Sequence, residues 1–191
     1  VASHLLEPLL AQGTTIPLVH VTDATPAFLR DAYGWSVPKE ADGIEKRLAA
    51  GAAATVYSSS VMAKRAAQDL GLPGLQPRAI PFGINLDDSP AQLPQKSPLS
   101  ELNLLFVGLD WARKGGDIAV AALDRLRAAG VDAHLTVVGR CPEKYKRHSA
   151  ITVAGFLNKN RPRDAAKLNQ LYTQAHLLLL PSRGDCTPMV L

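Results

Sequence analysis

The architecture can be read most directly from residues 102–116, Leu102-Asn103-Leu104-Leu105-Phe106-Val107-Gly108-Leu109-Asp110-Trp111-Ala112-Arg113-Lys114-Gly115-Gly116. Residues 102–107 form an apolar run closed by a glycine, which is typical of a buried strand that leaves a sheet. From about Gly115, apolar residues follow a helical period to about Ala129, and Gly130 ends the pattern. A buried strand followed by a helix predicts one βα unit of a parallel sheet.

Similar units lie on both sides of this stretch. Later in the chain, the patterns predict strands at 134–138, 151–154 and 176–180 and a helix at about 163–175. Earlier, they predict strands at 16–22, 54–58 and 78–81, with helices near 25–32, 44–50 and 61–70. Residues 86–101 are rich in Pro and Ser without hydrophobic period and read as a linker. The sequence therefore predicts two α/β domains, 1–85 and 102–191, with mostly parallel sheets.

Composition excludes several classes of protein. With 47% hydrophobic and 20% charged residues, the 191-residue chain is too apolar for a disordered tail. Two cysteines, Cys141 and Cys186, are too few for a disulfide scaffold, and no Cys or His spacing suits a metal. No apolar run reaches the length of about 20 residues that crosses a bilayer. We expect a cytoplasmic protein without a transmembrane segment or bound metal.

Charge is distributed unevenly along the chain. Residues 1–98 hold 8 Lys and Arg against 9 Asp and Glu, whereas residues 99–191 hold 13 against 8. The second half is therefore expected to bind an anion. Nucleic acid is disfavoured, because acids interrupt the basic residues and only 5% of residues are aromatic. A small phosphorylated ligand fits better, and a peripheral encounter with anionic lipid stays open.

Two segments that follow strands are candidate anion sites, because ligands of parallel sheets bind beyond the carboxyl ends of the strands. In one, Gly108 turns the backbone and the adjacent cations Arg113 and Lys114 precede a helix. In the other, Asp185 and Thr187 precede a helix start with Pro188 as its first residue. The alternatives are a surface turn with solvated cations and ordinary helix capping. Neither Walker A nor dinucleotide fingerprint is present.

Further candidates lie at other strand ends. Gly155 and Phe156 could bracket a planar base, although a core phenylalanine beside a glycine turn is the simpler interpretation of these two residues alone. Gly83 could let the backbone line a cleft, or form a bare turn. Asp23 could bind a hydroxylated substrate or cap the next helix. His20, two residues before the end of its strand, is interpreted as a structural histidine.

Taken in order, these segments resemble the family-four retaining glycosyltransferases of the GT-B fold. The resemblance rests on five segments: 80–85 (Ile-Pro-Phe-Gly-Ile-Asn), 105–108 with 113–117, 135–139, 155–157 and 179–183. It implies two Rossmann-like domains, with an acceptor bound by the first and a nucleotide-sugar donor bound mainly by the second. The chain begins with Val1 and ends in an unfinished helix start. We therefore expect an internal piece of a longer protein, with both domains incomplete and the piece alone inactive.

The resemblance also implies residue roles. Lys114 matches the lysine that contacts the donor diphosphate, and Arg113 could share that charge. The usual Gly-Arg after the first strand is Gly108-Leu109 here. Asp185 falls where the first acid of the Glu-x7-Glu motif faces the transferred sugar, and Gly155-Phe156 matches the loop that meets the nucleobase. Asp23 takes the position of a histidine found in many relatives.

The implied reaction transfers a sugar to a carbohydrate, lipid or other hydroxylated acceptor with retention at the anomeric carbon. Cations and helix N–H groups would stabilise the leaving diphosphate, so no cofactor is required. We expect the segment with Lys114 and the segment with Asp185 to converge on one pyrophosphate pocket. We also expect Lys114 to be exposed, so that Lys114→Ala changes turnover and not melting. The alternatives are a non-catalytic sugar-nucleotide-binding protein, which the Leu109 and Asp185 departures favour, and a nucleotide-sugar epimerase. A dehydrogenase ranks last.

Overall fold

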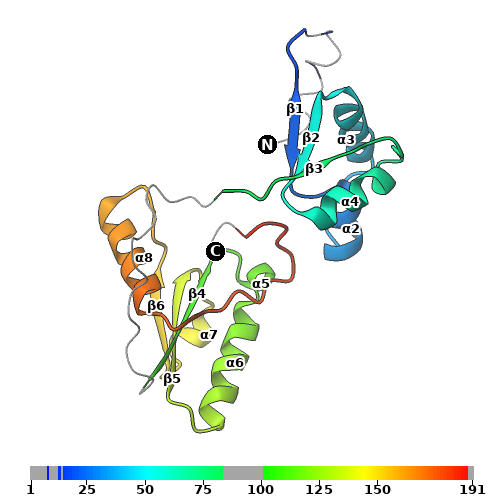
Figure 1. The fold of residues 1–191 in the computed structure, drawn as a ribbon. Coiled ribbons are helices and arrows are strands. Elements are labelled where there is room, and N and C mark those ends of the chain that lie inside the picture. Colours follow the sequence, from blue (N-terminus) through cyan, green and yellow to red (C-terminus); the bar gives the residue numbers. More distant parts are fainter. Residues whose placement is uncertain (1–7, 9–12, 14, 84–100, 189–191) are drawn as a thin grey trace. The chain divides into compact units, whose positions relative to one another are not determined.

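The computed structural model describes residues 8, 13, 15–83 and 101–188. These residues divide into two compact units, one of 8–83 together with 186–188, and one of 101–185. The predicted linker 86–101 lies outside the described residues except for Glu101. Both units contain parallel sheets with helical connections (Figure 1).

The first unit contains a three-stranded parallel sheet in the order β1-β2-β3. Its elements are β1 (Val19–Thr22), α2 (Pro26–Tyr33), α3 (Glu40–Gly51), β2 (Ala54–Tyr57), α4 (Ser60–Asp69) and β3 (Arg78–Ala79). Local sequence fixes the helix starts: Thr25 Oγ1 accepts from Phe28 N at 3.1 Å, and Ser59 Oγ accepts from Met62 N at 3.3 Å. The helices bury a small core around the fully buried ring of Tyr57.

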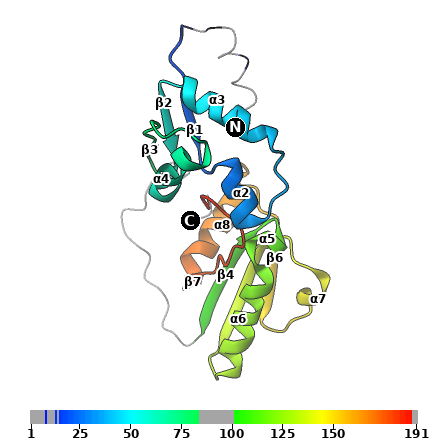
Figure 2. The ribbon, with the colours of Figure 1, turned by 90° about the vertical axis from the view of Figure 1, so that its right-hand side faces the viewer.

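The second unit contains a four-stranded parallel sheet in the order β6-β5-β4-β7. Its elements are β4 (Leu102–Gly108), α5 (Trp111–Lys114), α6 (Gly116–Ala128), β5 (Ala133–Gly139), α7 (Glu143–Lys146), β6 (Ile151–Gly155), α8 (Pro162–Gln174) and β7 (Leu177–Leu178). Helices α6 and α8 cover opposite faces (Figure 2). Phe106 and Leu135 pack with Leu123 of α6 in the main core. The predicted apolar strand 102–107 is thus the buried centre of the sheet.

Several predicted boundaries differ from the observed ones. The single-turn helices α5 and α7 were not predicted, because one turn is too short to show a period. Gly115, predicted to start a helix, adopts the left-handed conformation and separates α5 from α6. Strand β1 starts at Val19 instead of residue 16, since Pro17 has no N–H for the sheet. The helix predicted to start at Pro188 is not formed in the residues up to Pro188, and the rest of that predicted helix start lies outside the described residues.

Three glycines end the three adjacent strands β4, β5 and β6. Gly108 pairs with Gly139, and Gly155 lies beside Val138, so one edge of the sheet carries little side-chain bulk. Gly139 has a φ of +111°, and a Cβ built on it would lie 2.1 Å from the Gly108 carbonyl oxygen. The backbones therefore approach each other more closely than any side chain allows.

Replacing Gly139 by alanine should destabilise the second unit strongly. Positive φ alone costs an alanine about 1–2 kcal/mol. The clash with the Gly108 carbonyl adds about 1–3 kcal/mol to the loss in unfolding free energy, which urea unfolding would measure.

Gly130→Ala is the matched control, because Gly130 has a φ of +83° and nothing lies within 4 Å of an added Cβ. It should show only the conformational penalty. Equal losses for the two variants would contradict the close approach at the strand ends.

Candidate functional site

The short helix α5 presents two adjacent cations just beyond the end of β4. Asp110 caps the helix, since its Oδ1 accepts from Arg113 N at 3.1 Å. Its Oδ2 also accepts from Arg113 Nε at 3.3 Å. Lys114 is the last helical residue, and Gly115 then turns the chain into α6 with a φ of +75°. Arg113 and Lys114 therefore lie at the edge of the sheet where ligands of parallel sheets bind.

The loop that follows β7 packs directly on α5. Lys114 Nζ donates to Asp185 Oδ2, and each of these side chains is only 14% exposed. Arg113 donates through Nη1 to the Gly184 carbonyl oxygen at 2.9 Å and lies 3.8 Å from Asp185 Oδ1. The structure thus brings together the two segments that the sequence predicted to converge.

Glycines make this packing possible. A Cβ built on Gly115 would lie 2.0 Å from the Pro181 carbonyl oxygen, so the loop rests directly on that backbone. A Cβ on Gly108 would lie 3.1 Å from Cβ of Lys114 and equally close to Phe106. Gly108 therefore makes room for the lysine stem, which is a structural reason for a glycine at this position.

The expectation that Lys114 is an exposed cation is wrong. Its ammonium is largely buried and paired, so removal of the side chain leaves the Asp185 carboxylate short of a partner. Such a loss destabilises a protein more than removal of an exposed cation does. Lys114→Ala is therefore expected to lower the melting temperature as well, unlike the expectation from sequence.

A hollow of about 620 Å³ lies beside the cation pair. It is lined by Leu109, Asp110, Trp111, Ala112, Arg140, Cys141 and Pro142. Arg140 directly follows β5, its N–H donates to the Gly108 carbonyl oxygen at 3.2 Å, and its side chain is exposed.

Two other residues that line the hollow are held in place or uncharged. The ring of Trp111 packs between the rings of Phe106 and Tyr145, which fixes its position. Burial raises the pKa of the Cys141 thiol, which therefore stays neutral.

Charges at this edge are balanced in different ways. Asp110 and Asp185 neutralise Arg113 and Lys114. Within the described parts of the chain, by contrast, no carboxylate pairs with the guanidinium of Arg140. Sequence reasoning missed Arg140, although the rule applied to the other strand ends would have found it, because it directly follows the strand predicted at 134–138.

The loop after β6 carries the predicted base-binding residues. Gly155 has a φ of +76°, and the ring of Phe156 is 64% exposed. A core position for Phe156, the simpler interpretation of the sequence, is therefore excluded. Phe156 directly follows Gly155, so it lies at the same edge of the sheet as Gly108 and Gly139.

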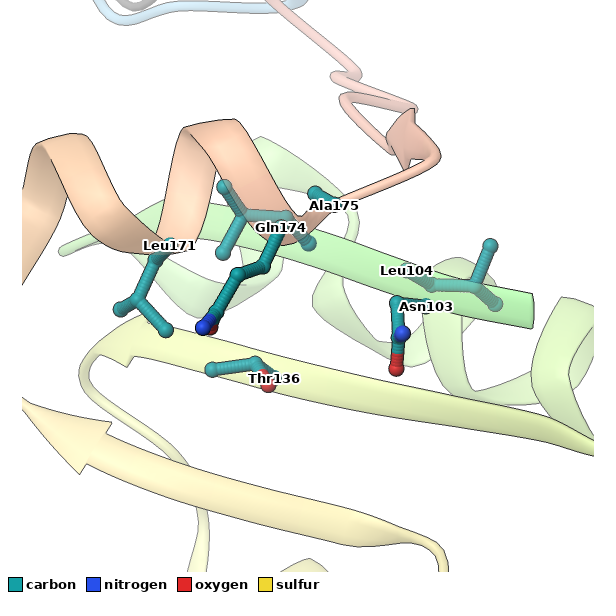
Figure 3. A pocket seen from close by; sticks show the side chains of 7 residues that line it. Asn103, Leu104, Thr136, Leu171, Gln174 and Ala175 are labelled. Atoms are coloured by element: carbon teal, nitrogen blue, oxygen red, sulfur yellow. The ribbon is translucent and has the colours of Figure 1, made fainter. Parts of the chain in front are cut away.

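A second pocket, of about 220 Å³, lies between α8 and the sheet (Figure 3). Its lining includes Leu171 and Gln174 of α8 and Asn103 and Thr136 of the sheet. It contains none of the predicted site residues and lies toward the middle and start of β4. The pocket is a packing gap under α8, distinct from the cation pair.

Three of the predicted site residues, Asp23, Gly83 and Thr187, belong to the first unit. Asp23 follows β1 and is half-buried, and Gly83 is exposed with nothing within 4 Å of an added Cβ. Thr187 belongs to this unit, where its Oγ1 donates to Ser58 Oγ at 2.6 Å. His20 is 3% exposed and its Nε2 lies 2.8 Å from Glu45 Oε1, which fits the structural histidine predicted.

Among the described residues, no three His, Cys, Asp or Glu side chains are grouped so as to hold a metal ion. None of the described helices has the length and apolar character that crossing a membrane requires.

Comparisons with known proteins identify the family. The model of a family described as "Family 4 Glycosyltransferase in conflict systems" matches residues 1–186. The chain belongs to this glycosyltransferase family. Among curated proteins, no match was found.

A solved glycosyltransferase structure has a fold similar to that of this family-4 glycosyltransferase chain. A structure titled "lipopolysaccharide outer core galactosyltransferase WaaB apo form" aligns with a TM-score of 0.58 at 16% sequence identity. The alignment covers 98% of this chain and 56% of the galactosyltransferase, so the chain spans little more than half the length of that protein. The match shows a GT-B fold with Rossmann-like domains, as the sequence resemblance predicted.

Proposed function

We propose that the full-length protein transfers a sugar from a nucleoside-diphosphate donor to a hydroxylated acceptor, with retention at the anomeric carbon. Family membership supports glycosyl transfer in general terms. The observation that carries the finer proposal is the meeting of Lys114 and Arg113 with Asp185 at the carboxyl edge of the sheet. Two cations and one carboxylate are the groups that a leaving diphosphate and a sugar would need.

Electrostatics explain how this cluster would act. The donor diphosphate develops negative charge as the glycosidic bond to it breaks, and fixed cations in a partly dry site stabilise that charge. In the structure, the Asp185 carboxylate pairs with the Lys114 ammonium. A bound diphosphate would compete for the lysine, and the released carboxylate would then face the sugar. The protein cations supply the charge stabilisation, so the proposal needs no added cofactor.

Other residues extend the proposed donor site. Arg140 would meet the diphosphate from the hollow beside α5, in place of the arginine that Leu109 replaces. The exposed ring of Phe156, beside Gly155, would stack on the nucleobase. Gly108 would let the diphosphate approach the backbone. Asp23 stays a proposal for a catalytic residue on the acceptor side, Gly83 for the cleft lining and Thr187 for donor binding.

One observation favours a second candidate, a protein that binds sugar nucleotides without transferring the sugar. Lys114 is already neutralised by Asp185, which is shorter than the glutamate implied by the resemblance. A carboxylate that stays on Lys114 when donor binds could not reach the sugar. Sugar transfer by the full-length protein would separate the two candidates.

Asp185→Asn should affect binding and turnover in opposite directions. Removing the competing charge should tighten nucleoside-diphosphate binding about tenfold, the effect of about 1.4 kcal/mol. Loss of the carboxylate should lower kcat by about tenfold or more. Isothermal titration and a transfer assay on the full-length protein measure the two effects.

The double variant Lys114→Ala with Asp185→Asn is the control for folding, because it leaves no unpaired charge. It should melt closer to the wild type than Lys114→Ala does, yet bind the nucleotide poorly. If Asp185→Asn weakens nucleotide binding, the proposed competition for Lys114 is wrong.

Arg140→Ala should weaken nucleoside-diphosphate binding about tenfold without changing the melting temperature. The side chain is exposed and makes no ion pair within the described residues, so it contributes little to stability. A contact to a phosphate is charge-assisted and is lost with the guanidinium. Titration at two salt concentrations would measure the loss.

Lys167→Ala on α8 removes the same formal charge away from the hollow and is the matched control. It should leave nucleotide affinity nearly unchanged. If both variants lower nucleotide affinity equally, the overall charge of the unit explains the loss, and Arg140 does not belong to a specific phosphate site.

A further inference from the structure

The segment that carries Asp185 is held on α5 and α6 by a second arginine, Arg183. Its two terminal nitrogens donate to the two Asp117 carboxylate oxygens at 2.8 and 2.7 Å. Nη1 also donates to the Ala112 carbonyl oxygen at 2.7 Å. The backbone N–H of Arg183 donates to the Arg113 carbonyl oxygen at 2.8 Å. One residue thus links the loop to the end of α5 and to the first turn of α6.

The chemistry of these contacts suits a fixed position. A bidentate pair between arginine and carboxylate sets both distance and orientation. Asp117 lies in the first turn of α6, where the helix dipole favours a negative charge. The Ala112 and Arg113 carbonyls lie at the C-terminal end of α5, where a cation is favourable. The Arg183 hydrogen bond lowers the pKa of Asp117 to about 2, so the pair is charged at neutral pH.

Stability alone does not explain this arrangement. The side chains of Arg183 and Asp117 are 49% and 44% exposed, and exposed ion pairs contribute little to the free energy of unfolding. The residues on either side, however, are the ones that the proposed site needs. Pro181 rests on Gly115, and Asp185 reaches Lys114 two residues after Arg183.

We propose that Arg183, held by Asp117, is a positioning residue that fixes the loop 181–185 on α5 so that the Asp185 carboxylate meets Lys114. This inference rests on the proposed function for its effect on turnover, but the effect on the loop itself does not depend on it. Among the described residues, the Arg183 side chain donates hydrogen bonds only to the Ala112 carbonyl oxygen and to Asp117, so it acts through the loop and not on the substrate. Removal of Arg183 leaves Arg113 and Lys114 in place to bind a diphosphate.

The test replaces Arg183 by alanine in the full-length protein and follows amide hydrogen exchange. Exchange of the amides of residues 182–185 should become about tenfold faster or more, because the loop opens locally more often. In a transfer assay kcat should fall about tenfold or more, while nucleoside-diphosphate affinity changes less than about threefold. Arg183→Lys keeps the charge without the bidentate geometry and should recover part of kcat.

Asp117→Asn should produce the same changes as Arg183→Ala. The double variant should add little to either single variant, because the two side chains act as one unit.

Arg127→Ala is the matched control. Arg127 is 41% exposed, pairs with Asp132 at 3.6 Å and donates to the Ala133 carbonyl oxygen at 2.9 Å, without a contact to the loop. It should leave loop exchange and kcat unchanged.

Two results would overturn the inference. Unchanged amide exchange in residues 182–185 after Arg183→Ala would show that the loop is held without Arg183. Faster exchange with unchanged kcat would show that holding the loop has no functional effect. A wild-type protein that neither binds a nucleoside diphosphate nor transfers a sugar would instead reject the proposed function. In that case the exchange comparison alone decides whether Arg183 holds the loop.

Discussion

The ion pair between Lys114 and Asp185 links the two segments on which the functional interpretation depends. These residues are 71 positions apart, and both side chains are largely withdrawn from water. A buried charge is tolerated only when an opposite charge meets it, so the loop after β7 and the end of α5 must be placed together. The carboxylate that pairs with the lysine in the structure would, under the proposed function, compete with a diphosphate for it.

The fold brings the pair together through the parallel sheet. Strands β4 and β7 are neighbours, so the segments that leave their carboxyl ends emerge at the same edge. Gly115 then lets the Pro181 backbone approach where any side chain would clash. Arg113 of α5 donates to the Gly184 carbonyl oxygen of the loop, and Arg183 of the loop donates to α5 and to Asp117. In the proposed site, the positions of Lys114 and Asp185 would thus be set mostly by backbone contacts and by charged side chains that do not take part in the reaction.

Much of this could be predicted from the sequence, because its signals are local. The apolar run 102–107 and the glycines after strands predicted the buried strands and the parallel sheets. The partners of each charge could not be predicted. That Arg183 pairs with Asp117, 66 residues away, depends on how two loops fold back on each other. The single-turn helix α5 was missed for a different reason: Asp110 and Gly115 define it by capping, and one turn is too short to show a period.

The contrast between Phe156 and His20 shows where residue patterns are ambiguous. An aromatic residue beside a glycine suits either a core or a ligand, and only its exposure excludes the core. A histidine in a strand likewise suits a catalytic or a structural role. The contact of buried His20 with Glu45 of α3 favours the structural role. Neither distinction is encoded within a few residues of the side chain concerned.

The structure of the full-length protein with a nucleoside diphosphate bound is the most direct measurement of the role assigned to the ion pair. Lys114 Nζ should then lie within hydrogen-bonding distance, about 2.7–2.9 Å, of a phosphate oxygen, with the Asp185 carboxylate released from it. A nucleotide bound elsewhere while Lys114 and Asp185 stay paired would contradict that role.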